Sequence, residues 1–238
     1  MRGELAAYFQ PQVELGSGRV VAAEALCRWT HPSLGVVPPT TFIAFAEGSV
    51  AIHEIGEFMV DAGCRFQANA NDLGKPLDVS INVSPAQLLN SSVLDLLLVQ
   101  IEALSLDRSR ITIEITESLE ILDVGAVVQQ LTAVRDAGIG VSIDDFGAGH
   151  SSLEQVLQFP VSEVKIDRSL VQGESDESRA RFSEVMDLAR SRSLCVVAEG
   201  VETEAQLQYV TELGCERAQG YLLGRAVPES RFEALYLS

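Results

Sequence analysis

Residues 7–28, AYFQPQVELGSGRVVAAEALCR, decide which fold the rest of the chain can adopt. Two candidate strands are separated by a short turn at Gly16-Ser17-Gly18: residues 7–13, which include Tyr8, Phe9 and Val13, and the mostly apolar residues 20–28, which begin with Val20 and Val21. A crossover between parallel strands needs roughly a dozen residues or more, so this turn can only join a hairpin. The first strand is therefore expected to run antiparallel to the second.

Beyond this hairpin, β-branched runs alternate with helical patterns almost to the C-terminus. Further strands are predicted over residues 77–82, 111–115, 140–144, 163–166, 194–198 and 217–221. Between them lie apolar residues at helical spacing, such as Ile55, Met59, Ala62 and Phe66. Eight strands with intervening helices in 238 residues predict a TIM-like (β/α)8 barrel with an antiparallel first strand, built as a single domain over residues 1–238.

Helix boundaries carry the residue types that such a fold needs. Thr203 and Gln206 have the spacing of a capping box. Gly138 and Gly214 stand where glycine ends a helix. These signals predict that helices follow several of the strands.

The composition excludes several classes of partner. Lys and Arg number 17 against 34 Asp and Glu, so the net charge is −17, and no dense basic run is present to bind long DNA or RNA. The four cysteines are scattered and form no CxxC pair, which is typical of reduced thiols. The N-terminal residues contain no apolar signal core, and no run is long enough to span a membrane. A cytoplasmic location is expected.

Polar residues stand at the ends of the predicted strands, where barrels of this kind place their chemistry. They are Glu24, Arg28, Asn82, Glu114, Asp144, Asp145, Lys165, Glu199 and Gln219. In a closed barrel these side chains would converge on one mouth.

Five carboxylates beside a single lysine would repel one another unless a cation lay between them. The oxygen-only ligand set, completed by the Asn82 carbonyl, favours Mg²⁺ or Mn²⁺ over Zn²⁺. Asp144 and Asp145 could each serve a different ion of a pair, and paired ions support displacement at phosphorus. With Arg28 holding a phosphate oxygen, phosphodiester hydrolysis is the reaction that this set serves best.

Each of these residues also has a purely structural interpretation, because a lone carboxylate at a strand end is often a cap or half of an ion pair. Gly147-Ala148-Gly149 lacks the third glycine of a dinucleotide loop and follows two aspartates that would repel a pyrophosphate. The three histidines have no metal-ligand spacing and are expected to be packing or loop residues. They are His31, His53 and His150.

Glu24-Ala25-Leu26, followed by Cys27-Arg28-Trp29, resembles the signature of the EAL domain, the bacterial cyclic di-GMP phosphodiesterase family. The likeness continues, in order, over nearly the whole chain. Its further segments are YFQP (8–11), NVS (82–84), EITE (114–117), DDFG (144–147), KID (165–167), EGVET (199–203) and QGY (219–221).

The resemblance implies hydrolysis of cyclic di-GMP to linear pGpG with Mg²⁺ or Mn²⁺, using two ions. It makes Glu24, Asn82, Glu114 and Asp144 ligands of the first ion, and Asp145 a ligand of the second.

Other roles are implied in the same way. Lys165 resembles the residue that orients the attacking water, and Glu199 the base. Three residues resemble substrate-binding residues of the family: Gln10, Arg28 and Gln219. By the same resemblance, Gln219 also completes the set of residues around the attacking water and the metal.

The loop after the DD pair departs from the family pattern. Where the family usually has DDFGTGYSSL, this chain has Ala148 and His150 in place of Thr and Tyr. His150 adds a group that titrates near neutrality. Because of Ala148 and His150, loop order, dimer contact or pH response could differ here. Glu117 matches a residue with which the family holds this loop.

Two alternatives to an active phosphodiesterase stay open. One is a silent EAL domain that acts as a cyclic di-GMP receptor. The other is a Mg²⁺-dependent lyase or isomerase of enolase type in which Lys165 abstracts a proton from carbon. By resemblance a homodimer is expected, with an upstream sensory or GGDEF domain if the sequence is part of a longer chain.

Overall fold

The computed structural model describes residues 3–89, 92–116, 124–147 and 158–238. It begins with the expected hairpin: β1 (Leu5–Glu14) pairs antiparallel with β2 (Arg19–His31). Gly18 closes the turn by donating its backbone N–H to the carbonyl oxygen of Glu14 at 2.8 Å. The predicted antiparallel first strand is confirmed.

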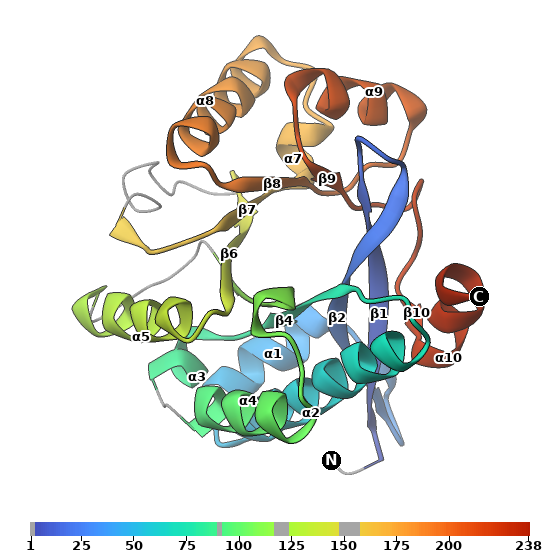
Figure 1. Ribbon diagram of the computed structural model, residues 1–238, viewed down its shortest axis with the longest axis vertical. Coiled ribbons are helices and arrows are strands. Elements are labelled where there is room, and N and C mark those ends of the chain that lie inside the picture. The colour runs from blue at the N-terminus through green and yellow to red at the C-terminus, as the bar shows by residue number, and fades with distance from the viewer. Residues whose placement is uncertain (1–2, 90–91, 117–123, 148–157) are drawn as a thin grey trace.

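The strands close into a barrel with helices outside it (Figure 1). Six strands continue parallel to β2, in the order β4 (Asp78–Asn82), β5 (Ile111–Thr116), β6 (Gly140–Phe146), β7 (Glu163–Ile166), β8 (Cys195–Ala198) and β9 (Arg217–Ala218). β1 pairs antiparallel with both β2 and β9 and so closes the ring. Two short strands, β3 (Gly35–Val37) and β10 (Val227–Pro228), extend the sheet beside β2 and β1. The predicted TIM-like barrel is confirmed.

The prediction that the eighth strand runs to residue 221 is wrong, because β9 ends at Ala218. Val201 donates its N–H to the Gln219 carbonyl and accepts a hydrogen bond from the N–H of Leu222, both at 3.1 Å. Between these bonds Gly220 lies so close that a Cβ there would come within 2.1 Å of the Val201 carbonyl oxygen. The chain therefore turns across Val201 instead of continuing the ladder.

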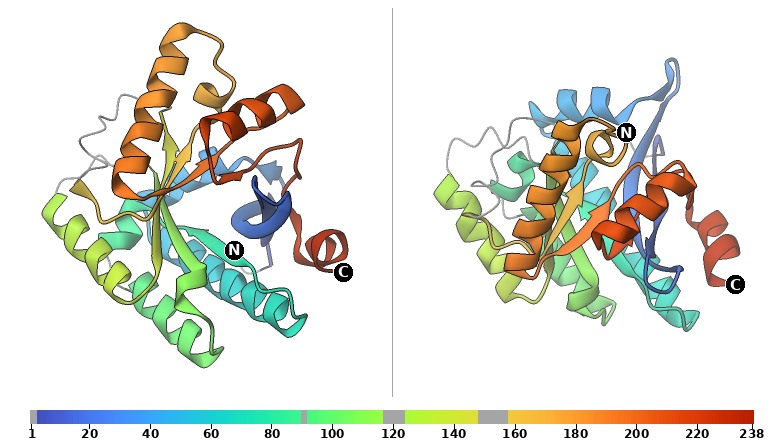
Figure 2. Two further views of the ribbon diagram at one scale, coloured as in Figure 1. Left: turned by 45° about the horizontal axis from the view of Figure 1, so that its top comes forward. Right: turned by 90° about the horizontal axis from the view of Figure 1, so that it is seen from above.

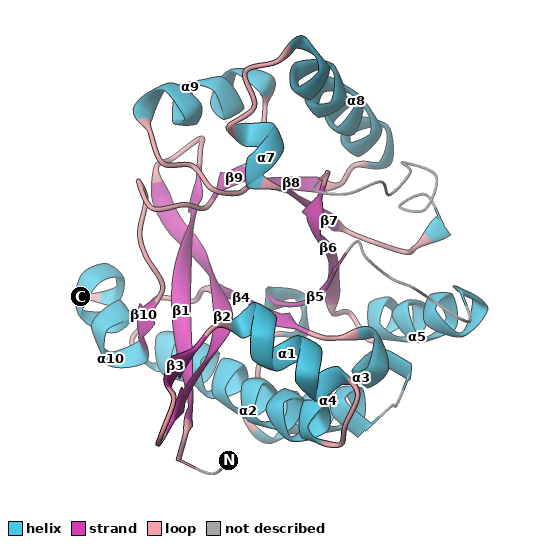
Figure 3. Ribbon diagram, turned by 180° about the vertical axis from the view of Figure 1, so that it is seen from behind, coloured by secondary structure: helices cyan, strands magenta, loops and turns pink. Residues whose placement is uncertain are grey.

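Helices surround the barrel on its outer side (Figure 3). They are α1 (Pro39–Glu47), α2 (Ala51–Asp72), α3 (Pro85–Leu89), α4 (Ser92–Ala103), α5 (Val124–Asp136), α7 (Arg168–Val171), α8 (Asp176–Arg192), α9 (Glu204–Leu213) and α10 (Glu229–Phe232). A 3₁₀ turn (Arg108–Arg110) and a π turn (Glu233–Leu237) complete the described elements. Among the described helices, none has the length and hydrophobicity that crossing a membrane would require.

Aromatic contacts hold the C-terminal segment against the first strand. Phe9 of β1 stacks on Phe66 of α2 with 3.9 Å between the ring centroids, and Phe232 of α10 meets Phe66 edge-on at 5.1 Å. All three rings are buried. Figure 2 accordingly shows α10 beside the β1 side of the barrel.

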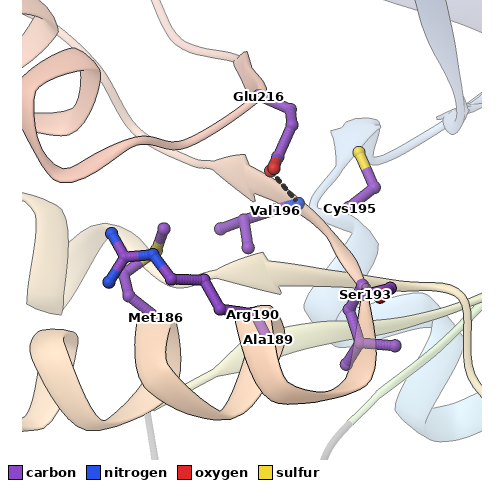
Figure 4. Close-up of a pocket in the computed structure, with 8 residues that line it drawn as sticks. Met186, Ala189, Arg190, Ser193, Cys195, Val196 and Glu216 are labelled. Carbon is purple, nitrogen blue, oxygen red and sulfur yellow. Dashed lines mark hydrogen bonds between the residues drawn. The ribbon is translucent and has the colours of Figure 1, made fainter.

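A pocket of about 390 Å³ lies at the amino ends of β8 and β9, beside the end of α8 (Figure 4). Met186 and Arg190 line one side of it, and Cys195 lies at its β8 wall. Glu216 accepts a hydrogen bond from the Val196 N–H at 2.7 Å. The predicted site residues follow the carboxyl ends of the strands, so this pocket lies at the other end of the barrel.

The capping box at α9 yields a stability prediction. The Thr203 hydroxyl accepts from the Gln206 N–H at 3.2 Å, and the Gln206 side chain accepts from the Thr203 N–H at 3.0 Å. Thr203→Ala leaves a helix N–H without its partner and is expected to lower the free energy of unfolding by about 1 kcal/mol, measured by urea denaturation. Thr211→Ala, an exposed change later in the same helix, is the control and should shift it by less than about 0.5 kcal/mol. Equal losses in both variants would contradict the capping role.

Candidate functional site

A buried lysine lies at the centre of the polar residues that end the strands. Lys165 of β7 is completely inaccessible to solvent, and its Nζ makes ion pairs with four carboxylates. The distances are 3.2 Å to Glu24 Oε2, 2.9 Å to Glu114 Oε2, 2.9 Å to Asp144 Oδ1 and 2.8 Å to Glu199 Oε1. The structure thus brings together residues up to 175 positions apart in the chain (199 − 24).

Strand register explains this convergence. Asn82 is paired with Glu114 across β4 and β5, and Thr116 with Asp144 across β5 and β6. Side chains alternate along a strand, so Glu114 and Lys165 point into the barrel while their neighbours point toward the helices. Glu199 directly follows β8, and its N–H is fixed by a 3.0 Å bond to the Ile166 carbonyl.

Two amides hold Glu24 in place. Asn82 donates from Nδ2 to Glu24 Oε1 at 3.0 Å, and Gln219 donates from Nε2 to Glu24 Oε2 at 2.6 Å. Burial acts to raise the pKa of Glu24, but Lys165 and these two amides outweigh it, so its pKa lies below the usual value. Glu24 is therefore a stable anion in the centre of the site.

The single ammonium cannot neutralise the remaining acids. Burial would lower the pKa of Lys165, yet the surrounding carboxylates raise it well above normal, so the side chain stays charged. Burial and the nearby Glu24 carboxylate raise the pKa of Glu114 well above its usual range. Burial raises the pKa of Glu199 to about 8, against the opposing effect of Lys165. Burial, followed by repulsion from Asp144, raises the pKa of Asp145 to about 6.

The carboxylates carry more negative charge than the Lys165 ammonium can balance, and a bound cation would compensate for the difference. Among the residues that the structure describes, two groups have carboxylate oxygens within 4.8 Å of one another: Glu24, Glu114 and Asp144, and then Asp144, Asp145 and Glu199. Within the described residues, the Oε1 atom of Glu114 is buried and has no hydrogen-bond partner. Hard oxygen ligands with an unsatisfied carboxylate atom are what a divalent cation of the Mg²⁺ type needs, so these acidic clusters could bind metal.

Asp145 reaches the second group through an unusual backbone conformation. Its φ is +56°, in the left-handed region that residues other than glycine rarely adopt. Asp144 and Asp145 are adjacent, so this turn lets both carboxylates face the same centre instead of opposite sides of β6. Strain of this kind is typical of functional sites.

Two cavities open around the cluster and share Glu24, Leu26, Asp144 and Asp145. The larger, of about 630 Å³, is lined by Gln10, Glu199 and Gln219. The smaller, of about 270 Å³, includes Arg28, Asn82 and an apolar wall that contains Ile43 and Met59.

The structure therefore places every predicted metal, catalytic and substrate-binding residue around these two cavities or, for Lys165 and Glu114, in the ion-pair cluster beneath them. Glu117, Ala148 and His150 lie outside the described residues.

Sequence reasoning gave no role to some residues that line the larger cavity. Asp167, Arg168, Glu202 and Tyr221 also line the larger cavity. Each of these residues directly follows a strand end or a motif residue, and that position is the sequence feature that could have identified them. Asp167, Glu202 and Tyr221 belonged to quoted motifs but received no role.

The EAL domain family model matches residues 1–226 of the chain. The chain belongs to the EAL family. This EAL domain is 37% identical over 232 residues to the cyclic di-GMP phosphodiesterase RocR of Pseudomonas aeruginosa, a match that covers 97% of this chain and 59% of RocR. It is also 37% identical to the bifunctional diguanylate cyclase/cyclic di-GMP phosphodiesterase MucR of the same organism, over 98% of this chain and 34% of MucR.

Solved structures agree with this membership. The PaMucR phosphodiesterase in complex with c-di-GMP superposes with a TM-score of 0.89 at 37% identity, covering 97% of this chain and 95% of that one. The EAL enzyme Bd1971 in its cAMP and cyclic-di-GMP bound form gives 0.92 at 31% identity, covering 99% and 65%. The chain thus spans 59% of the length of RocR and 34% of that of MucR.

The buried lysine yields a prediction about stability and metal. Lys165→Met leaves several buried carboxylates without their shared cation, so in EDTA we expect the free energy of unfolding to fall by about 3–5 kcal/mol. Excess Mg²⁺ should restore more stability to the variant than it adds to the wild type, because a bound cation replaces the lost charge. Denaturant unfolding of both proteins, with EDTA and with Mg²⁺, measures the difference.

The exposed Lys75 offers the matched control. Lys75→Met removes the same charge from the surface and should change stability by less than about 0.5 kcal/mol under either condition. A Lys165→Met variant as stable as the wild type in EDTA would show that the lysine does not compensate the carboxylates.

Proposed function

We propose that this EAL domain hydrolyses one phosphodiester bond of cyclic di-GMP and releases linear pGpG. The observation that carries the proposal is the cluster of four carboxylates on the Lys165 ammonium, with two cavities opening around it. The naming of RocR as a cyclic di-GMP phosphodiesterase and the c-di-GMP complex of PaMucR support the choice of substrate.

In this proposal Arg28 would contact the substrate from the smaller cavity and Gln10 from the larger one. Arg28 donates from Nη1 to the Cys27 carbonyl at 3.0 Å, which holds its guanidinium at the smaller cavity, where it can bind a phosphate oxygen. Gln10 donates from Nε2 to the Gly224 carbonyl at 3.1 Å on the wall of the larger one. The cyclic dinucleotide would lie across both cavities with one phosphate above the carboxylates.

Two divalent ions, Mg²⁺ or Mn²⁺, complete the site in this proposal. Glu24, Asn82, Glu114 and Asp144 would hold the first and Asp145 would serve the second. When bound, such ions offset phosphate charge and make water more acidic. The Asn82 amide directs its nitrogen to Glu24, which leaves its carbonyl oxygen available as a ligand.

Lys165 and Glu199 would act on the attacking water. The Lys165 ammonium orients it, and Glu199, whose Oε1 lies 2.8 Å from Nζ, accepts its proton. The water oxygen forms a bond to phosphorus while the bond from phosphorus to O3′ breaks. The O3′ leaving group takes a proton from solvent, which gives the 5′-phosphate and free 3′-hydroxyl of pGpG. Gln219, bonded to Glu24, would complete the shell around the water and contact substrate.

The same environment disfavours the lyase or isomerase alternative. A lysine that removes a proton from carbon must be neutral, whereas four ion pairs hold Lys165 as an ammonium. The receptor alternative makes a different prediction, which is binding without product.

We also infer that residues 1–238 act as one domain, and the closed barrel and the family match over 1–226 support this. A cytoplasmic location is inferred because cyclic di-GMP is a second messenger. If the sequence is part of a longer chain, an upstream sensory or GGDEF domain is proposed; RocR and MucR are both longer than the region that matches this chain. A homodimer rests on the resemblance alone, and light scattering of the purified chain tests it.

The activity prediction uses purified protein, cyclic di-GMP and Mg²⁺ or Mn²⁺, with pGpG followed by chromatography. Turnover should require the metal and disappear in EDTA. Lys165→Ala and Glu24→Ala should each reduce it by about 100-fold or more, because each removes a group that contacts water or metal.

Glu216→Gln, at the opposite end of the barrel, is the control and should keep near-normal turnover because its side-chain oxygen can still accept from Val196. Calorimetric binding of cyclic di-GMP without any product would favour the receptor. Full activity in Glu24→Ala would refute its assignment as a ligand.

A further inference from the structure

A basic cavity lies at the amino end of the barrel, away from the carboxylate cluster. Its volume is about 850 Å³, and Asp78 and Arg217, the first residues of β4 and β9, lie on its wall. Of the described residues that line it, none lines the two cavities at the mouth or the pocket of Figure 4. A space of this size is within the range of about 300–1,000 Å³ that is typical of small-molecule sites.

Four basic side chains reach this cavity from separate parts of the chain. They are Arg19 at the start of β2, Lys75 before β4, Arg110 before β5 and Arg217 in β9. Three acids line it as well: Glu14, Asp78 and Asp107. The wall therefore carries one net positive charge in a chain whose net charge is −17. Such a local reversal of charge favours an anionic ligand.

Two of the arginines share one carboxylate. Asp78 accepts from Arg110 Nη1 at 3.1 Å and from Arg217 Nη2 at 2.6 Å. The next carboxylates lie farther away, Asp107 at 3.9 Å from Arg110 Nε and Glu163 at 3.9 Å from Arg217 Nη1. A guanidinium has five N–H donors, so each arginine keeps donors for a further acceptor while Asp78 holds both in place.

Arg19 and Lys75 are the other two cations of the wall. Within the part of the chain that the structure describes, neither lies within ion-pair distance of an acid. Glu14, which is paired with Arg19 across the hairpin, accepts instead from the Ser17 hydroxyl at 2.6 Å. Both cations are exposed, so they can turn toward a ligand without breaking an ion pair.

Another part of the wall is apolar. It includes Val20, Leu77, Leu235 and Tyr236. Leu77 is buried, whereas Leu235 is 48% exposed. The Tyr236 ring packs on Phe232 with 4.8 Å between the ring centroids, which fixes it on the wall. A ligand with an anionic group and a flat apolar group would contact both kinds of surface.

We propose that the basic cavity binds a nucleoside monophosphate. Its phosphate, with a charge of about −1.5 to −2 at pH 7, would accept hydrogen bonds from Arg110 and Arg217, whose planar forks match phosphate oxygens. Arg19 and Lys75 would add charge at the rim, and the base would lie on the apolar wall. This site does not depend on the proposed function, because it uses no residue of the carboxylate cluster or of the two cavities beside it.

The experiment measures by calorimetry the binding of AMP, inorganic phosphate and adenosine to the purified chain in EDTA. AMP should bind. Inorganic phosphate should bind about threefold or more weakly because it cannot contact the apolar wall, and adenosine should show no binding because it carries no charge. Arg19→Met and Lys75→Met should each weaken the binding of AMP by about 2- to 5-fold, and the double variant by about 5- to 20-fold. Arg110→Lys keeps a charge for Asp78 but loses the planar fork, and should weaken the binding of AMP by about 5-fold.

Two further variants serve as controls. Arg192→Met removes an exposed charge at the end of α8 that lines none of the four cavities described above. Arg28→Met removes the arginine of the smaller cavity, where the phosphate of AMP could bind instead. Both variants should bind AMP as the wild type does.

Four results would overturn the proposal. One is a wild type that does not bind AMP, and another is an Arg19→Met/Lys75→Met double variant with unchanged affinity. Loss of binding in Arg28→Met would place AMP at the mouth of the barrel. Inorganic phosphate or adenosine that binds as tightly as AMP would show that the base or the phosphate makes no contact in the cavity.

Discussion

The ion pairs of the buried Lys165 ammonium are the interaction on which the site depends. Four carboxylates lie within 3.2 Å of its Nζ, and without that charge their burial and mutual repulsion would oppose closure of the barrel mouth. One positive charge does not balance four acids. Burial, together with repulsion from neighbouring carboxylates, raises the pKa values of Glu114 and Glu199. The lysine therefore lets the barrel close while the capacity to bind a further cation is retained.

The reversed first strand shapes the surroundings of this cluster. β1 closes the ring between β2 and β9, and Gln10 is paired with Glu24, so a side chain from the middle of β1 reaches the mouth. The same Gln10 holds the Gly224 carbonyl and with it the turn after β9. The hairpin thus closes the barrel and also places the segment that carries Gln219 and Tyr221.

Under the proposed function, the two cavities would share the binding of a dianionic cyclic dinucleotide. The carboxylates that they share, Glu24, Asp144 and Asp145, would be the place where the phosphate and its cations bind. Around it, arginines supply positive charge within a chain of net charge −17: Arg28 in the smaller cavity and Arg168 in the larger, with Arg225 behind Tyr221.

The sequence by itself determined the barrel, its reversed first strand, the capping box at Thr203 and the identity of the acids and lysine that meet at the mouth. These features depend on local signals: turn length, residue periodicity and the position of polar residues after strands. It did not determine that the last strand stops at Ala218, that one Nζ contacts four carboxylates, or that Arg225 covers Tyr221. Those features arise only when segments far apart in the chain are brought within a few ångströms by closure of the barrel, and no local pattern encodes such distances.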